Sequence, residues 1–275
     1  MIRNNFLSPI SVLLMCAIIP PARANDGGIA YGGSPGLLHG HPSISMTSER
    51  ILLAVGEKEV HVECNFEFTN SGKACTVRMG FPDEGYGAFD PDEENASDNL
   101  MQTPARTTFT SFKSYINGKQ VATKLIRADK PGHYWHAKTV QFAANQTLKI
   151  RDVYIQRIGG GIATVAGKTG SVKEVGYVLH TGASWHGPIG RSEVTVDFSS
   201  ARTVTPIVPV ALKDVATKKA GEEPSAADIV RAPGGCIVWS GPGAPTISGT
   251  RLTFLKTNWK PSKKDDIDLN YEYKY

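Results

Sequence analysis

Seven carboxylates and no basic side chain lie in the stretch PDEGYGAFDPDEENASDN, residues 82–99. Asp90, Asp92 and Glu94 are spaced two residues apart within it, and carboxylate oxygens are the ligands that calcium takes in exported proteins. These three residues are therefore the candidate metal ligands. The glycine and the closing glutamate of an EF-hand loop are absent, so we favour a solvated loop without a cofactor. A calcium-stabilised adhesion module is the alternative.

The carboxylates of loop 83–98 could also serve a hydrolase of envelope glycan or peptidoglycan. Together with His180 or His186 they would supply the groups that general acid–base catalysis uses. The sequence has no motif of a serine nucleophile, a zinc protease or a phosphate-binding loop. We therefore predict no catalytic residue and favour a non-catalytic protein, with the hydrolase as the alternative.

Aromatic residues beside histidines form the second group of candidates. Trp185 and His186 lie in TGASWHGPIG, and Tyr134 and Trp135 lie in GHYWHAK. Their rings could stack on a sugar or contact a protein partner. Core packing is the alternative for each of them. We expect Trp185 to fold back as a plug over the end of a sandwich, with His186 at its rim, because a large aromatic side chain is usually packed.

The first 24 residues have the three parts of a secretory signal peptide. Arg3 is followed by an apolar run at 12–19, and a small-x-small cleavage site ends at Ala24. The run is too short to span a bilayer, so we expect an exported periplasmic or extracellular protein without a membrane span. Removing Arg3 and Arg23 leaves 28 basic against 26 acidic residues. This balance does not indicate nucleic-acid binding, and an envelope protein or polysaccharide is the expected partner.

Alternating apolar and polar residues predict strands along almost the whole chain. Segments 60–68 and 75–81 alternate on either side of Asn70 and predict an antiparallel hairpin with one buried face. Asn117-Gly118 predicts a second hairpin with a type I′ turn. A third hairpin is expected to turn near Asn145.

The strand pattern predicts an all-β protein of two consecutive antiparallel, Ig-like β-sandwiches. A Gly/Pro-rich linker at 25–42 precedes the first sandwich at 43–158, which carries the acidic loop 82–106. A Gly-rich connector or loose hairpin at 159–175 leads to the second sandwich at 176–275. A single continuous β assembly is the alternative.

Three cysteines remain after signal removal: Cys64, Cys75 and Cys236. In the predicted hairpin, the first two lie about four residues apart along the ladder, roughly 13 Å at the rise of a strand. That distance exceeds what a disulfide spans. We expect buried thiols, or one bond from Cys236 to either partner, with at least one cysteine free.

Four segments carry residues in a recognisable pattern. TGASWHGPIG contains T-G-x-x-W-x-G-P-I-G, and the N-terminal strands carry Met46, Glu49 and Asn70 in order. A central segment runs from Trp135 to Gly159-Gly160, and NWKPSKKDDIDLNYEY lies near the end of the chain. Together these segments resemble the exported bacterial family of unknown function DUF4424. The acidic stretch after Pro82 departs from the family pattern. The resemblance implies an exported β-rich protein and assigns no catalytic residue.

Overall fold

A computed structural model describes residues 30–33, 36–37, 41–85, 107, 109–127, 133–165, 168–201, 208–211 and 236–274. These residues form strands and two short 3-10 turns, η1 (His180–Ser184) and η2 (Lys263–Asp265), and no α-helix. The predicted all-β class is therefore confirmed. Within the described ranges, no helix is long and apolar enough to cross a membrane.

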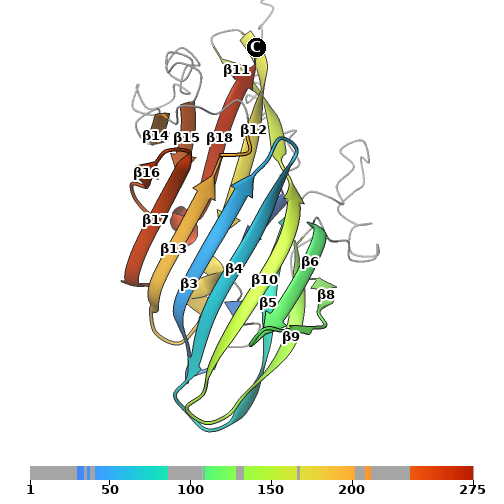
Figure 1. Cartoon of the computed structure of the whole chain (residues 1–275), viewed down its shortest axis with the longest axis vertical. Helices are drawn as coiled ribbons and strands as arrows, with labels where there is room; N and C mark the ends of the chain where they lie inside the picture. Colours follow the sequence, from blue (N-terminus) through green and yellow to red (C-terminus); the bar gives the residue numbers. More distant parts are fainter. Residues whose placement is uncertain are drawn as a thin grey trace, which may run out of the picture.

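The strands lie in two sheets (Figure 1). The ten-stranded sheet contains, along its path, β14 (Val208–Ala211), β15 (Cys236–Ser240), β18 (Ile267–Lys274), β12 (Lys168–Val178), β1 (Ala30–Gly33), β5 (Cys75–Gly85), β9 (His133–Phe142) and β8 (Lys124–Arg127), with β11 (Gly159–Val165) paired to β12 and β2 (Gly36–Leu37) paired to β5. The eight-stranded sheet contains, in order, β16 (Thr246–Ser248), β17 (Arg251–Trp259), β13 (Ile189–Asp197), β3 (Ile44–Val55), β4 (Glu59–Asn70), β10 (Thr147–Arg157), β6 (Phe109–Ile116) and β7 (Lys119–Val121).

Each sheet contains strands from both of the segments that the sequence predicted to be separate sandwiches. β3 pairs in parallel with β13 over seven residue pairs, from Arg191–Ser48 to Asp197–Ala54. In the other sheet β1 pairs in parallel with β12. The division into two consecutive Ig-like sandwiches is thus wrong, and the alternative of one continuous β assembly holds. The Gly-rich segment after residue 158 is the β11–β12 hairpin, and the segment expected to be a linker contains β1 and β2.

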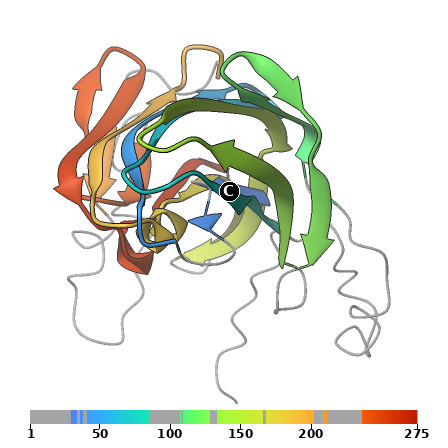
Figure 2. The same cartoon turned by 90° about the horizontal axis from the view of Figure 1, so that it is seen from below.

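The inner faces of the two sheets enclose one hydrophobic core (Figure 2). Phe81 of the ten-stranded sheet contacts Tyr154 of the eight-stranded sheet, with ring centroids 5.2 Å apart. Toward the other edge of the two sheets, Trp239 of β15 contacts Phe254 of β17, with ring centroids 5.6 Å apart. The alternation in the sequence arises because each strand turns every second side chain into this core.

Two of the predicted hairpins are instead crossings between the sheets. β4 ends at Asn70 in the eight-stranded sheet, and β5 begins at Cys75 in the ten-stranded one. The chain crosses back between Phe142 of β9 and Thr147 of β10. Both crossings lie at the same end of the molecule (Figure 1). Sequence alternation did not reveal them, because a strand with one buried face has the same pattern in a hairpin and in a crossing.

Asn70 holds the two crossings together. Its Nδ2 donates to the backbone oxygens of Lys73 at 2.8 Å and Ala143 at 3.0 Å, one from each crossing. Its Oδ1 accepts hydrogen bonds from Ser43 Oγ at 2.7 Å and from the Gly72 backbone at 3.0 Å. The side chain is fully buried, so these bonds replace the water that its amide loses.

The β6–β7 hairpin is the turn that the sequence located correctly. Asn117 and Gly118 both have positive φ, 48° and 81°, as a type I′ turn requires. Ile116 pairs with Lys119 across the turn. Asparagine and glycine tolerate the left-handed region at low cost, and this local property makes the turn readable from sequence.

Cys64 and Cys75 are both free thiols. They lie in different sheets, so the predicted hairpin register between them is wrong although the absence of a Cys64–Cys75 bond is right. Since both are free, neither is bonded to Cys236. Burial raises the pKa of the Cys64 thiol well above its usual range, so it stays protonated at neutral pH.

Candidate functional site

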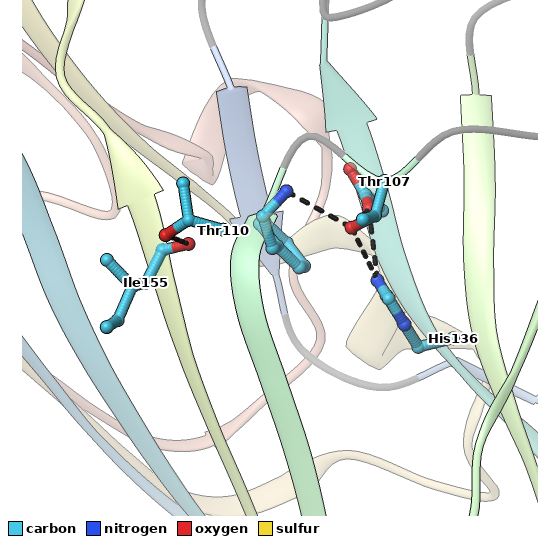
Figure 3. A network of polar contacts seen from close by, with 6 residues as sticks. Thr107, Thr110, His136 and Ile155 are labelled. Carbon is cyan, nitrogen blue, oxygen red and sulfur yellow. Dashed lines mark hydrogen bonds and ion pairs between the residues drawn. The ribbon is translucent and has the colours of Figure 1, made fainter.

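Asp83, His136 and Thr107 form a polar cluster where β5, β9 and the start of β6 meet (Figure 3). His136 Nε2 lies 3.0 Å from Asp83 Oδ2 and 3.2 Å from Thr107 Oγ1. The Thr107 hydroxyl donates to the same Asp83 oxygen at 2.6 Å. The imidazole ring stacks on Phe112 at 4.0 Å between centroids, which fixes its plane. Asp83 is fully buried and His136 nearly so.

The connectivity of this cluster differs from that of a nucleophilic triad. In a triad the carboxylate holds one ring nitrogen and the hydroxyl reaches the other. Here the same nitrogen, Nε2 of His136, contacts both Asp83 and Thr107. The Thr107 hydroxyl gives its proton to the carboxylate and accepts the backbone N–H of Phe109 at 3.1 Å. The cluster therefore ties three strands together, and its hydroxyl is not activated for attack.

A second cluster is buried between the sheets. Lys138 Nζ donates to both oxygens of Asp152, at 2.6 and 2.7 Å, and to Ser114 Oγ at 2.7 Å. The lysine comes from β9 of one sheet, and the other two residues come from β10 and β6 of the other. The side chains of Lys138 and Asp152 are 1% and 0% exposed. All three ammonium donors have acceptors, as a buried charge requires.

Two further polar contacts are buried elsewhere in the interior. Ser192 Oγ of β13 donates to Glu49 Oε1 of β3 at 2.5 Å. Cys64 Sγ lies 3.5 Å from the Tyr177 hydroxyl, across the two sheets. Glu49 points inward because a β-bulge between Met46 and Ser48 shifts the alternation of β3 by one residue. Sequence alternation identifies Asp83, Lys138 and Asp152 as inward positions, but it does not show which residues they bond.

Trp185 is packed in the core as expected. Its side chain is 2% exposed, and its ring lies 4.4 Å from that of Phe68. His186 is exposed, and its backbone N–H donates to Ile44 O at 3.0 Å, which attaches the loop to the start of β3. Tyr134 is buried and Trp135 is half-buried on the neighbouring position of β9. The structure does not bring these four residues together into one site.

Gly190 lies at the end of the loop that contains Trp185 and His186, directly against β3. A Cβ at this position would lie 2.4 Å from the backbone oxygen of Thr47, so only glycine fits. We expect Gly190→Ala to lower the free energy of unfolding by about 3 kcal/mol, because a backbone oxygen cannot move without disturbing the β3–β13 pairing. Urea unfolding measures this value.

Gly187→Ala is the control for this prediction. The φ of Gly187 is 69°, so alanine there is strained, but its Cβ would meet nothing within 4 Å, and the loss should be about 1 kcal/mol. Equal losses would contradict the steric explanation.

The candidate metal ligands Asp90, Asp92 and Glu94 lie outside the described residues. Among the residues that the structure does describe, no group of three or more His, Cys, Asp and Glu side chains could hold a metal ion. His180, considered for a hydrolase, has its Nδ1 2.7 Å from Asp266 Oδ2. Asp266 Oδ1 accepts the backbone N–H groups of Leu179 and His180, at 2.7 and 2.9 Å. This carboxylate thus fixes the end of β12 and the start of η1.

Comparison with known proteins finds a family model that matches the N-terminal part of the chain. The family model of DUF4424, a domain of unknown function, matches residues 24–130. The resemblance found in the sequence is confirmed for this segment, whereas TGASWHGPIG lies beyond the matched residues. No curated protein matches the chain.

One solved structure has a fold similar to that of this chain. The crystal structure of a "putative nutrient binding protein" from Legionella pneumophila is similar over 90% of this chain and 72% of its own, with 21% identity and a TM-score of 0.59. Two other structures are less similar: an M1 zinc metallopeptidase from Deinococcus radiodurans (10% identity, 84% of this chain and 43% of that chain covered, TM-score 0.32) and yeast LTA4 hydrolase (8% identity, 85% and 29% covered, TM-score 0.41). The first likeness shows a shared fold.

Outside the DUF4424 segment, Glu174 and Asp268 form a carboxylate pair on neighbouring strands. Glu174 lies opposite Asn270, and Asp268 lies opposite Gly176, so the two carboxyl groups are diagonal neighbours on one side of the sheet. Neither Glu174 Oε2 nor Asp268 Oδ1 has a hydrogen-bond partner among the described residues. Burial, reinforced by the neighbouring Asp268, raises the pKa of Glu174 from 4.5 to about 7.

The raised pKa of Glu174 makes the stability of the protein depend on pH. Between pH 4.5 and 7 the folded protein keeps a proton that the unfolded chain has released, so stability is lost as the pH rises through this range. Because the carboxyl group is only half-buried, water screens part of the effect, and we expect a loss of about 1 kcal/mol between pH 5 and pH 8. Glu174→Gln should remove most of this slope in urea unfolding at the two pH values. An unchanged slope would assign the dependence to other groups.

The outer face of the eight-stranded sheet carries exposed apolar side chains beside paired charges. Leu52 of β3 is 40% exposed and Leu255 of β17 is 50% exposed. β13 lies between these two strands. Its Thr195 Oγ1 is hydrogen-bonded to Thr253 Oγ1 of β17 at 3.1 Å, and its Glu193 Oε1 lies 3.5 Å from Arg50 Nε of β3. Strands that lie far apart in the sequence build this face, which we call the outer face of β3, β13 and β17.

Proposed function

We propose that this protein is an exported, non-catalytic binding protein of the bacterial envelope, and that the outer face of β3, β13 and β17 contacts its partner. The observation that carries the proposal is the exposure of Leu52 and Leu255 on an ordered sheet face. Large apolar side chains surrounded by polar neighbours are typical of protein contact surfaces. An envelope protein is therefore the leading partner and a polysaccharide the alternative.

The polar clusters support binding over catalysis. The Thr107 hydroxyl and His136 share the Asp83 carboxylate, and Lys138 is fully engaged inside the core. These groups hold strands together rather than meet a substrate. The Legionella protein with a similar fold is described as a "putative nutrient binding protein", and a binding role here agrees with that description. The signal-peptide pattern of residues 1–24 supports export.

Crosslinking in the native envelope, followed by mass spectrometry of the captured partner, tests the proposal. Leu52→Lys with Leu255→Lys should reduce recovery of the partner by tenfold or more, equivalent to about 1.4 kcal/mol of binding free energy. The control is Thr139→Lys with Gln141→Lys, which adds the same two charges to exposed positions of β9 in the other sheet. Both variants should keep the melting temperature of the wild type, because all four side chains are exposed.

Three outcomes would contradict the proposal. Equal recovery of the partner by both double variants would remove this face as the contact surface. Turnover of peptidoglycan that survives chelation and is lost with Glu94→Gln would make the protein a hydrolase. A calcium-dependent rise in melting temperature that Asp90→Ala with Asp92→Ala abolishes would make it a calcium-stabilised module.

A further inference from the structure

The amine of Lys138 and the carboxyl group of Asp152 are close enough to react with each other. The Nζ atom lies 2.6 and 2.7 Å from the two carboxylate oxygens, and the two residues belong to opposite sheets. The Lys149–Glu67 ion pair, by contrast, has side chains that are 77% and 42% exposed and lies in water. An amine and a carboxyl group held in contact at a dry site are the components of an amide bond.

The surroundings of this pair exclude water on both sides. Each member of the Ser114–Lys138–Asp152 cluster has an aromatic ring two residues away on the same strand face: Phe112 on β6, His136 on β9 and Tyr154 on β10. These three rings form one stack, with the centroids of Phe112 and His136 4.0 Å apart and those of Phe112 and Tyr154 6.4 Å apart. On the opposite side of the cluster lie Val140 and Ile150, both 1% exposed.

We propose that Lys138 and Asp152 become joined by an intramolecular isopeptide bond after the chain has folded. One ammonium proton first moves to the carboxylate, directly or through the Ser114 hydroxyl 2.7 Å from Nζ, and this frees the nitrogen lone pair. Nζ then attacks Cγ of Asp152, the new C–N bond forms, and one C–O bond breaks. The oxygen leaves with two protons as water, so an ammonium and a carboxylate give one amide and one water molecule with no oxidant or cofactor.

Two physical effects favour the amide at this site. Groups held in contact within one molecule react as if at concentrations on the order of 10⁵–10⁸ M, which opposes hydrolysis of the product. The amide also replaces two buried charges, whose removal from water is costly, by one neutral group. Ser114 can accept a hydrogen bond from the new amide N–H, because its hydroxyl already accepts one from Nζ.

The bond would close the crossing between the sheets. It would link β9 to β10 across residues 142–147, the crossing in which Asn70 already binds the backbone oxygen of Ala143. The structure has no disulfide between Cys64 and Cys75 to do this. The proposed bond gives the two large sheets a covalent tie that does not depend on the redox state of the compartment.

Tryptic mapping of the intact purified chain tests the bond directly. An isopeptide at Lys138 blocks cleavage there, so we expect peptide 128–149 joined to peptide 152–157 with a mass one water below their sum. The separate peptides 128–138 and 152–157 should be depleted in the same digest. Fragmentation of the joined peptide locates the link between Lys138 and Asp152.

Lys138→Arg is the decisive variant, because it keeps the positive charge and cannot form the amide. Its map should show peptide 152–157 in full and no joined species, whereas the surface control Lys149→Arg should retain the bond. Separate linear peptides from the wild type would overturn the proposal. Loss of one water that persists in Lys138→Arg would also overturn it. The wild-type map stands even if a variant fails to fold.

Discussion

Replacing Lys138 with methionine is expected to lower the free energy of unfolding by about 3–5 kcal/mol. The variant leaves the Asp152 carboxylate, which is fully buried, without the ammonium that now donates to both of its oxygens. A buried charge without its partner is among the costliest defects that one substitution can make. Urea unfolding followed by intrinsic fluorescence measures the loss. Lys149→Met is the matched control, since its ion pair with Glu67 is exposed and its removal should cost less than about 0.5 kcal/mol.

A double variant separates the contribution of charge from that of a covalent bond. Lys138→Met with Asp152→Leu removes both charges and fills the space with apolar atoms. If the wild type holds an ion pair alone, this variant should regain most of the lost stability, because apolar replacement of a buried pair is often neutral. If the isopeptide bond is present, the double variant should stay well below the wild type. A single variant as stable as the wild type would show that Asp152 is not a buried charge.

The strands were predictable from the sequence, but their assignment to sheets was not. Residues 60–68 and 75–81 alternate correctly, and both strands exist. Alternation records only that one face of each strand is buried, and this is true whether the next strand is a neighbour in the same sheet or lies across the core. The decisive feature is the bonding of Asn70 to Ala143, 73 residues away, which no local pattern contains.

The polar clusters were missed for a similar reason. Lys138 and Asp152 both occupy positions where alternation places a side chain inside, between apolar or aromatic neighbours on the same face. A charged residue at such a position indicates a buried partner. The identity of this partner depends on how the two sheets face each other. The hairpins predicted from the sequence placed the strands in the wrong sheets, so they could not identify the partner. Glu49 was hidden further by the bulge in β3, which a single sequence does not show.

Replacing Trp185 with alanine is expected to cost about 3–5 kcal/mol of unfolding free energy. The side chain is 2% exposed and its ring packs on Phe68, so the variant leaves a cavity at the point where the loop after η1 meets the core. The loop is also fixed by its backbone, through His186 to Ile44 and through the close approach of Gly190 to Thr47. The cavity therefore cannot close by collapse of the loop, which places the expected loss toward the upper part of the range.

The neighbouring residue gives the control for this prediction. His186 is exposed and follows Trp185 directly, and His186→Ala should change the unfolding free energy by less than about 0.5 kcal/mol. Trp185→Phe should lose less than Trp185→Ala, because the smaller ring still fills part of the space against Phe68. Both values come from urea unfolding. If Trp185→Ala kept full stability but lost the captured envelope partner, Trp185 would belong to a binding surface and not to the core.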